Sequence, residues 1–414
     1  TRWRVCKQEK ENNKNYAECL KKQDSILVHT DIAESPWVIV EGTDKLYAAC
    51  KIVSTLVSRM EEALQASRTP QETPKLPETE ECFRNGVLHG IDLSKSMTKE
   101  EYQVEKKKLQ KKLRSLHNQM YLKRLPVVLA FEGWDAGGKG GAIKRLTQAM
   151  DPRGYEVVPT ASPNDVEKAH HYLWRFWEKF PKAGHMAIFD RTWYGRVLVE
   201  RVEGFATESE WKRAYREIND MEEQITNAGG ILLKFWMHID KDEQERRFHE
   251  REQIPEKQWK ITDEDWRNRA RWDDYEKAVD EMILRTSTES APWIVVEGNS
   301  KYYARIKVLK TVVDAIEQKL KDFIPTIFNK YRYIVFIMAT GIVVRTIAPL
   351  IQSKFQDPAV IVTDEKGKNV ISLLSGHMGG ANEMTLYISN LINSNPVITT
   401  ATDVNKKSSL DMIA

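Results

Sequence analysis

A glycine-rich loop follows a run of apolar residues in the second quarter of the chain. Residues 127–131 are apolar, and residues 133–141 read Gly-Trp-Asp-Ala-Gly-Gly-Lys-Gly-Gly. Glycines let successive backbone N–H groups turn toward one anion, and a helix that begins there adds its positive dipole end. Lys139 would neutralise the terminal phosphates of a ligand. The pattern therefore predicts a strand, a phosphate-binding loop and a helix that hold and move phosphoryl groups.

One position of this loop departs from the usual phosphate-binding pattern. Gly140 stands where that pattern has Ser or Thr, whose hydroxyl ordinarily binds magnesium. The metal must then find other oxygens, and the nearest are those of Asp135 inside the loop.

A second motif, residues 190–196, reads Asp-Arg-Thr-Trp-Tyr-Gly-Arg and ends another apolar run. A carboxylate at a strand end beside a phosphate-binding loop is a usual position for a magnesium ligand, which makes Asp190 a candidate. Arg191 and Arg196 would clamp phosphates through bidentate hydrogen bonds. For an Asp-Arg pair taken alone, a structural ion pair is the alternative.

A third cluster of cations lies in residues 246–260. Arg247 and Arg251 are four residues apart and share one helix face. The cluster is similar to the mobile lid of phosphoryl-transfer enzymes, which closes over the phosphates and excludes water. The alternative is an exposed helix whose cations are neutralised by Glu243, Glu245, Glu250 and Glu252.

An internal repeat indicates how the chain is divided. Residues 35–64 align without gaps with residues 291–320, with Pro-Trp, Val-Glu-Gly and Tyr-Ala in register. Chance similarity is the alternative. Each copy predicts a short strand, a turn and an amphipathic helix. We therefore expect residues 1–64 to be the C-terminal part of a first domain, so that the chain begins within a domain, and the proline-containing residues 65–82 to be a linker.

The central region, residues 83–322, predicts a complete α/β domain with a P-loop kinase-like parallel sheet flanked by helices. Within it, a basic helix should precede the first strand, from the capping box at Thr98 to about Lys123. Pro325 is expected just past its last helix. The expected strands are 127–132, 156–160, 185–190, 231–238 and 293–297, and the expected helices are 141–150, 165–180, 207–228, 241–252 and 263–286.

Composition excludes several classes of protein. The 414 residues carry 63 basic and 60 acidic side chains, so the net charge of +3 favours no particular partner. The four cysteines lie in the first fifth and lack metal-ligand spacing, which favours a reduced, cytoplasmic protein. No apolar run approaches the ~20 residues that span a bilayer. We expect neither nucleic acid nor membrane as a partner.

Together the three motifs resemble the polyphosphate kinase 2 family over residues 83–322, and residues 1–64 resemble the end of a second such domain. The variant at residues 193–205 is similar to its tandem-domain polyphosphate:AMP phosphotransferase subgroup. The resemblance implies phosphoryl transfer between inorganic polyphosphate and AMP or ADP, Mg²⁺ as cofactor, and a homo-oligomer. An ATP-dependent nucleoside-monophosphate kinase, or a non-catalytic scaffold that presents a corrinoid module, are the alternatives.

The resemblance also implies roles for individual residues. Asp135 and Asp190 would hold the metal. The resemblance assigns catalytic roles to Asp135, Lys139, Asp190, Arg191, Arg247 and Arg251. Those implied in phosphate binding are Gly133, Gly137, Gly138, Lys139, Gly140, Gly141, Lys144 and Arg196.

The last part of the chain carries different motifs. Residues 339–345 and 375–382 include Ala-Thr-Gly and Ser-Gly-His, and the region 332–414 has no tryptophan. These motifs resemble the N-terminal domain of cobalt-precorrin-5A hydrolase, a cobalamin-biosynthesis enzyme, over residues 332–405. We expect a separate, partial α/β domain, with Arg345 and His377 belonging to the motifs of that family.

Overall fold

The computed structural model describes residues 6–68, 86–328, 330–353, 355–364, 366–376 and 379–399. The chain divides into two compact units, Thr1–Glu72 and Thr73–Ala414. Most of the predicted linker and His377 lie outside the described residues. No helix in the described part of the chain is long and apolar enough to cross a membrane.

The first unit contains three helices, α1 (Lys7–Lys14), α2 (Tyr16–Thr30) and α3 (Lys45–Arg68). The amphipathic helix predicted for the first repeat is α3. The prediction of a strand before α3 is wrong. Within residues 6–68 the structure has no strand, and the only β-type pairing is an isolated bridge between Ile32 and Ser35. A strand needs a neighbouring strand to pair its backbone groups. Within residues 6–68 the first repeat has no such neighbour, whereas its counterpart in the second repeat, β5, pairs with β4 of the central sheet.

The central sheet has five strands in the order β2-β3-β1-β4-β5, all parallel. The strands are β1 (Val127–Gly133), β2 (Tyr155–Pro159), β3 (Met186–Asp190), β4 (Ile231–His238) and β5 (Trp293–Glu297). The predicted α/β fold is confirmed. Strand β1 lies in the middle, and Phe131 pairs in register with Asp190 on one side and Phe235 on the other. Parallel strands meet with their carboxyl ends at one edge, so the loops after β1 and β3 are neighbours.

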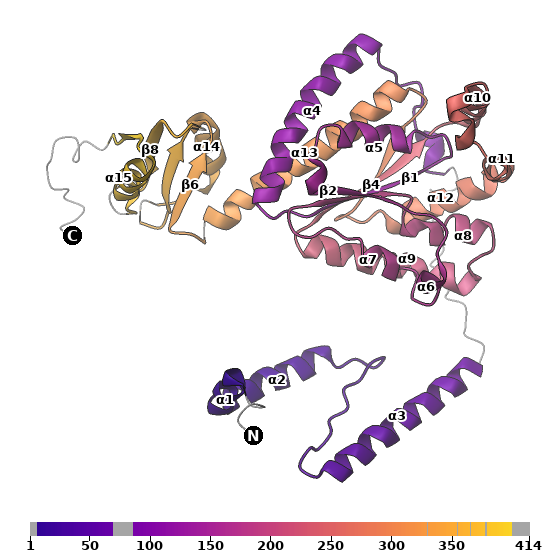
Figure 1. Ribbon diagram of the computed structural model, residues 1–414, viewed down its shortest axis with the longest axis horizontal. Coiled ribbons are helices and arrows are strands. Elements are labelled where there is room, and N and C mark those ends of the chain that lie inside the picture. Colours follow the sequence, from indigo (N-terminus) through magenta and orange to yellow (C-terminus); the bar gives the residue numbers. More distant parts are fainter. Residues whose placement is uncertain are drawn as a thin grey trace. The chain divides into compact units, whose positions relative to one another are not determined.

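Helices cover both faces of this sheet (Figure 1). One face packs against α4 (Lys99–Leu122), α5 (Lys139–Thr147) and α13 (Lys301–Phe328). The other packs against α7 (Trp174–Trp177), α9 (Glu208–Asn227) and α12 (Trp272–Thr286). The predicted capping box starts α4, because Thr98 Oγ1 accepts from Glu101 N at 3.2 Å and Glu101 Oε2 accepts from Thr98 N at 3.0 Å.

Two helices that the sequence predicted as continuous are broken. The stretch 165–180 contains α6 (Asp165–Lys168) and α7, and the turn between them carries Leu173 into the core. The stretch 263–286 contains α11 (Asp263–Ala270) and α12, separated at Arg271. This break lets Trp272 stack on Trp134 with ring centroids 3.7 Å apart. Tertiary packing therefore overrides the continuous helical pattern at both places. The remaining helical elements of this region are η3 (Leu88–Gly90), η4 (Pro152–Gly154), η5 (Trp193–Arg196), α8 (Val199–Val202), α10 (Lys241–Glu252) and η6 (Pro255–Lys260).

The expectation that Pro325 lies past the last helix is wrong, because α13 continues through it to Phe328. Proline removes one helical hydrogen bond. Phe328 is nevertheless buried beside Ile334 and Phe336, and this packing favours the final turn.

A second, four-stranded sheet follows in the order β6-β7-β8-β9, with an antiparallel step between β7 and β8. Its elements are β6 (Tyr333–Ile337), α14 (Thr340–Ile347), η7 (Ala348–Leu350), β7 (Ala359–Thr363), β8 (Asn369–Leu374), α15 (Ala381–Ile392) and β9 (Asn395–Val397). The predicted small α/β fold at this end of the chain is confirmed.

Candidate active site at the phosphate-binding loop

The glycine-rich loop joins β1 to α5 with a backbone that glycine alone fits at two positions. Gly133 has φ 144°, and an added Cβ would lie 2.5 Å from Met237 O. Gly138, at the N-cap of α5, has φ 109°. No described side chain caps α5. The N–H groups of its first turn are therefore oriented for an anion.

The loop forms part of the wall of two cavities. Gly133, Trp134, Asp135 and Lys139 line a cavity of about 550 Å³. Ala136, Gly137 and Gly138 line a second cavity of about 180 Å³. One short segment of backbone therefore borders two separate cavities.

The larger cavity combines aromatic and cationic walls. Trp134 and Trp272 stack on each other and line it together with Trp236. Its cations come from the loop, from the segment after β3 and from the neighbouring helices: Lys139, Lys168, Arg175, Arg191, Arg196 and Arg269. Flat apolar surfaces beside several cations suit an aromatic ring that carries phosphate.

Lys139 lies folded over the loop that precedes it. Its ammonium donates to Gly133 O and, at 3.3 Å, to Trp134 O. The amine is thus held at the border of the larger cavity by carbonyl groups, without an ion pair to a described carboxylate. Its charge remains available to a phosphate.

Arg191 and Asp135 meet at the wall of the larger cavity, with Arg191 Nη2 3.5 Å from Asp135 Oδ1. Burial works against the charge of Arg191, but the carboxylates of Asp135 and Glu132 outweigh it and raise the pKa of the guanidinium. Arg191 has φ 65°, a strained value for a non-glycine residue. Asp190 ends β3, but its side chain is not among the described residues that line this cavity.

Glu132 fixes the turn that carries Arg191. Its Oε1 accepts from Thr192 N at 2.7 Å and from Thr192 Oγ1 at 2.8 Å. Burial raises the pKa of this carboxyl, and the nearby charge of Lys139 opposes that effect. The sequence patterns did not single out Glu132, although a carboxylate inside an apolar strand is an unusual position that could have done so.

The residues that follow Thr192 are fixed by a buried network of hydrogen bonds centred on Glu222. Trp193 Nε1 and Tyr194 OH both donate to Glu222 Oε1, at 3.0 and 2.7 Å, and Lys234 Nζ lies 2.7 Å from Glu222 Oε2. The side chains of Glu222 and Lys234 are 1 % and 0 % exposed. Arg196 follows in η5 and pairs with Glu200 at 3.1 Å. The guanidinium of Arg196 also lies over the ring of Tyr172.

Arg247 lies against the loop rather than in solvent. Its guanidinium donates to Ala136 O at 2.9 Å and to Gly298 O and Glu243 Oε1 at 2.6 Å each, and its side chain is 3 % exposed. These bonds fasten α10 to the phosphate-binding loop and to the end of β5. Arg247 also lines the smaller cavity, so a role toward phosphate remains a prediction.

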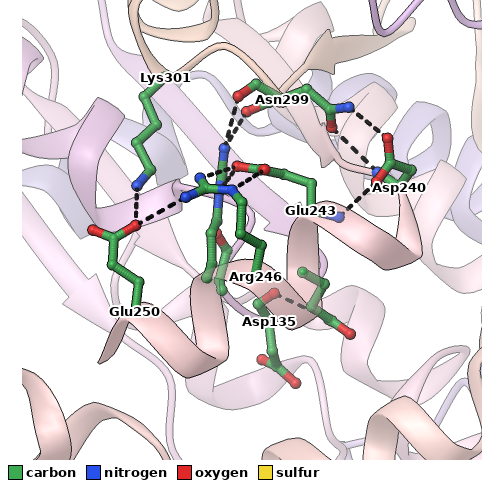
Figure 2. Close-up of polar contacts among 11 residues, drawn as sticks. Asp135, Asp240, Glu243, Arg246, Glu250, Asn299 and Lys301 are labelled. Carbon is green, nitrogen blue, oxygen red and sulfur yellow. Dashed lines mark hydrogen bonds and ion pairs between the residues drawn. The ribbon is translucent and has the colours of Figure 1, made fainter. Parts of the chain in front are cut away.

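The outer surface of α10 is neutralised by its own carboxylates. Figure 2 shows Glu250 between Arg246 and Lys301, at 3.5 and 3.3 Å, and Arg246 also bonded to Glu243 at 2.7 Å. Arg251 lines the smaller cavity with Lys301 and Arg305. Lys144, a predicted phosphate ligand, is on α5 and outside the described residues that line either cavity.

A magnesium ion would find part of its oxygen shell at this site. Among the described residues, no three His, Cys, Asp or Glu side chains gather as a metal-binding group. Mg²⁺, however, is commonly held by one or two carboxylates together with substrate phosphates and water. Asp135 fits that pattern, because its carboxylate lines the larger cavity beside Lys139 and Arg191 and has one amide donor, Asn268 Nδ2, at 3.2 Å.

The parallel sheet, the loop at its centre and the cation-lined cavities define a P-loop kinase-like phosphate-binding protein. The chain belongs to the polyphosphate kinase 2 family, since the sequence model of that family matches residues 1–68 and 96–323. A second family model, cobalamin synthesis G N-terminal, matches residues 322–403. Both family resemblances inferred from the motifs are confirmed.

Two curated relatives are named polyphosphate:AMP phosphotransferase. The protein of Pseudomonas syringae pv. tomato is 45 % identical over 319 residues, which cover 76 % of this chain and 64 % of the relative. The protein of Pseudomonas aeruginosa is 46 % identical over 302 residues, which cover 72 % of this chain and 60 % of the relative. The chain thus spans less than two thirds of the length of either relative.

Solved structures agree with the fold. A crystal structure of polyphosphate kinase 2 from Arthrobacter aurescens TC1 is 35 % identical with a TM-score of 0.55, covering 57 % of this chain and 88 % of that one. A Pseudomonas aeruginosa PA01 structure described as a polyphosphate kinase 2 is 44 % identical with a TM-score of 0.66, covering 77 % and 66 %.

Proposed function

We propose that this protein catalyses magnesium-dependent transfer of a phosphoryl group between inorganic polyphosphate and an adenine nucleotide, with AMP as acceptor. The observation that carries the proposal is the position of the phosphate-binding loop in the walls of two different cavities. Two phosphorylated substrates bound on either side of one loop can meet at its N–H groups. The names of the two curated relatives support the choice of polyphosphate and AMP.

The two cavities differ in a way that suits the two substrates. The larger one, at about 550 Å³, falls in the size range of small-molecule sites and offers tryptophan surfaces to a base. The smaller one has no aromatic lining among the described residues and carries Arg247, Arg251, Lys301 and Arg305. A polyphosphate chain has charge but no ring, so we assign the nucleotide to the larger cavity and the phosphate donor to the smaller one.

The reaction breaks the P–O bond between the terminal phosphoryl group and the rest of the polyphosphate chain. An oxygen of the AMP phosphate forms the new P–O bond, and the shortened chain leaves with the electron pair. Such transfer needs positioning and charge neutralisation more than a covalent nucleophile. Lys139 and the N–H groups of α5 would hold the transferring group, and Arg191 would steady the acceptor phosphate.

Asp135 would hold the metal, with Asp190 as a second proposed ligand. A bound Mg²⁺ would supply charge neutralisation between the phosphate oxygens. Because Arg191 is 3.5 Å from Asp135, the acceptor phosphate that Arg191 binds would lie close to the same carboxylate.

The proposal is tested by incubating the purified protein with Mg²⁺, AMP and either linear polyphosphate or ATP, and by resolving the nucleotide products. The expected result is formation of ADP from AMP and polyphosphate. A parallel reaction offers ADP in place of AMP as the acceptor for comparison. Transfer from ATP alone would identify an ATP-dependent nucleoside-monophosphate kinase instead. Absence of transfer from either donor would contradict a phosphotransferase.

A further inference from the structure

Arg305 on α13 is a cation of the smaller cavity that no sequence motif singled out. Its guanidinium lies beside the start of α5, where a Cβ added to Gly141 would stand 3.4 Å from Arg305 Nη2. The side chain is half-buried and lines the smaller cavity together with Gly137 and Gly138 of the loop.

Among the described residues, none neutralises the charge of Arg305. It has no hydrogen bond or ion pair with any described residue. Its neighbours in the same cavity differ: Arg247 is occupied by Glu243 and three backbone carbonyls, and Lys301 pairs with Glu250 at 3.3 Å. A guanidinium that faces a cavity without a partner can give its planar donors to a phosphate.

The internal repeat shows whether the helix needs an arginine at position 305 in order to form. In register, Arg305 corresponds to Ala49, and both sequences form long helices, α13 and α3. The ion pair at the base of the helix is kept in both copies, as Glu297–Lys307 at 2.5 Å and Glu41–Lys51 at 2.6 Å. The helix therefore forms with alanine at this position, and the arginine is not required for it.

We propose that Arg305 is a phosphate-binding residue for the donor, acting on the polyphosphate chain and not on the nucleotide. The assignment rests on the proposed function, because it takes the smaller cavity as the donor side of the loop. Arg305 lines that cavity and is absent from the described lining of the larger one. Its bidentate donors would hold phosphate oxygens next to those bound by the N–H groups of Gly137 and Gly138.

The test compares Arg305→Ala, Arg305→Lys and the control Lys310→Ala in the full chain. Lys310 is an exposed cation of the same helix outside both cavities. We expect Arg305→Ala to raise the KM for linear polyphosphate about tenfold or more, as loss of a charge-assisted hydrogen bond implies. The KM for AMP and the melting temperature should stay unchanged. Arg305→Lys should fall between, and Lys310→Ala should behave as wild type.

A binding measurement keeps the inference testable without turnover. Titration calorimetry with tripolyphosphate should show weaker binding to Arg305→Ala than to wild type and to Lys310→Ala. If the wild type transfers phosphate and the donor KM is unchanged in Arg305→Ala, the inference is wrong while the proposed function stands. If the wild type does not transfer, the proposed function fails, and equal tripolyphosphate binding by all the proteins would then overturn the role of Arg305 as well.

Discussion

Glu132, in the central strand β1, accepts two hydrogen bonds from Thr192, the second residue after the neighbouring strand β3, at 2.7 and 2.8 Å. Arg191 lies between that strand and Thr192, and its N–H donates to Phe131 O at 3.1 Å. The strained backbone of Arg191 is therefore fixed on both sides, and its side chain is directed to Asp135.

We predict that Glu132→Ala lowers kcat/KM by about 10²-fold, because a small displacement of Arg191 misplaces the phosphate it holds. Glu132→Gln keeps an oxygen that can accept both bonds and should recover most of the activity. Kinetics measured alongside thermal melting separate this effect from unfolding. A folded Ala variant with wild-type kcat/KM would show that the Thr192 contact does not position Arg191.

The buried pair Lys234–Glu222 should be far more sensitive than a surface pair. Lys234→Met leaves a carboxylate buried without its cation, which costs about 3–5 kcal/mol. The matched control is Arg213→Met, which breaks the exposed pair with Glu217 at 3.0 Å and should cost no more than about 1 kcal/mol. Denaturant unfolding measures both. Equal losses in the two variants would contradict the importance of the network behind residues 193 and 194.

The stability of the domain should fall in mild acid partly through His238. Burial lowers the pKa of His238 to about 4, and the neutral ring accepts from Trp134 Nε1 at 3.1 Å. Between the unfolded pKa near 6.5 and about 4, the unfolded chain binds a proton that the folded chain does not, so stability decreases as pH falls. The full effect is about 3 kcal/mol.

His238→Asn, which cannot take up a proton, should therefore lose less stability than wild type between pH 6.5 and pH 4. The measurement is unfolding free energy against pH for both proteins. Parallel curves over that window would show that His238 does not contribute to acid sensitivity.

The metal requirement should respond to Asp135 and Asp190. Asp135→Asn should raise the Mg²⁺ concentration for half-maximal activity, because its carboxylate lines the larger cavity. Asp190→Asn tests the second predicted ligand. Conversely, Gly140→Ser restores a hydroxyl where a Cβ meets no atom within 4 Å, and it should lower the requirement. Unchanged Mg²⁺ titrations in both Asn variants would place the metal elsewhere.

The sequence predicted the sheet well because its signals are local. Apolar runs and glycine-rich turns lie next to each other in the chain, and all five strands form within one residue of the expected bounds. The failures depend on partners distant in sequence. The helical pattern breaks at Arg271, and Trp272 starts a new helix stacked on Trp134. Residues 37–41 form no strand, because they pair with no strand among the described residues.

The candidate site was predicted in part for the same reason. Lys139, Asp135 and Arg191 belong to motifs that can be read from the chain, and they line one cavity. Glu132 and Arg305 carry no motif, and their positions become evident once β1 meets β3 and α13 meets α5. Arg247 was expected on a moving lid, but its contact with Ala136 O depends on packing that its helical spacing does not reveal.

The most direct test of transfer at the glycine-rich loop is the turnover of Lys139→Ala with Mg²⁺, polyphosphate and AMP, measured with its melting curve. Loss of one charge contact to the transferring group costs roughly 3–4 kcal/mol, or about 10²–10³ in rate. We expect that loss of rate in a variant that melts as wild type does. Near-normal turnover in the folded variant would show that phosphoryl transfer does not take place at this loop.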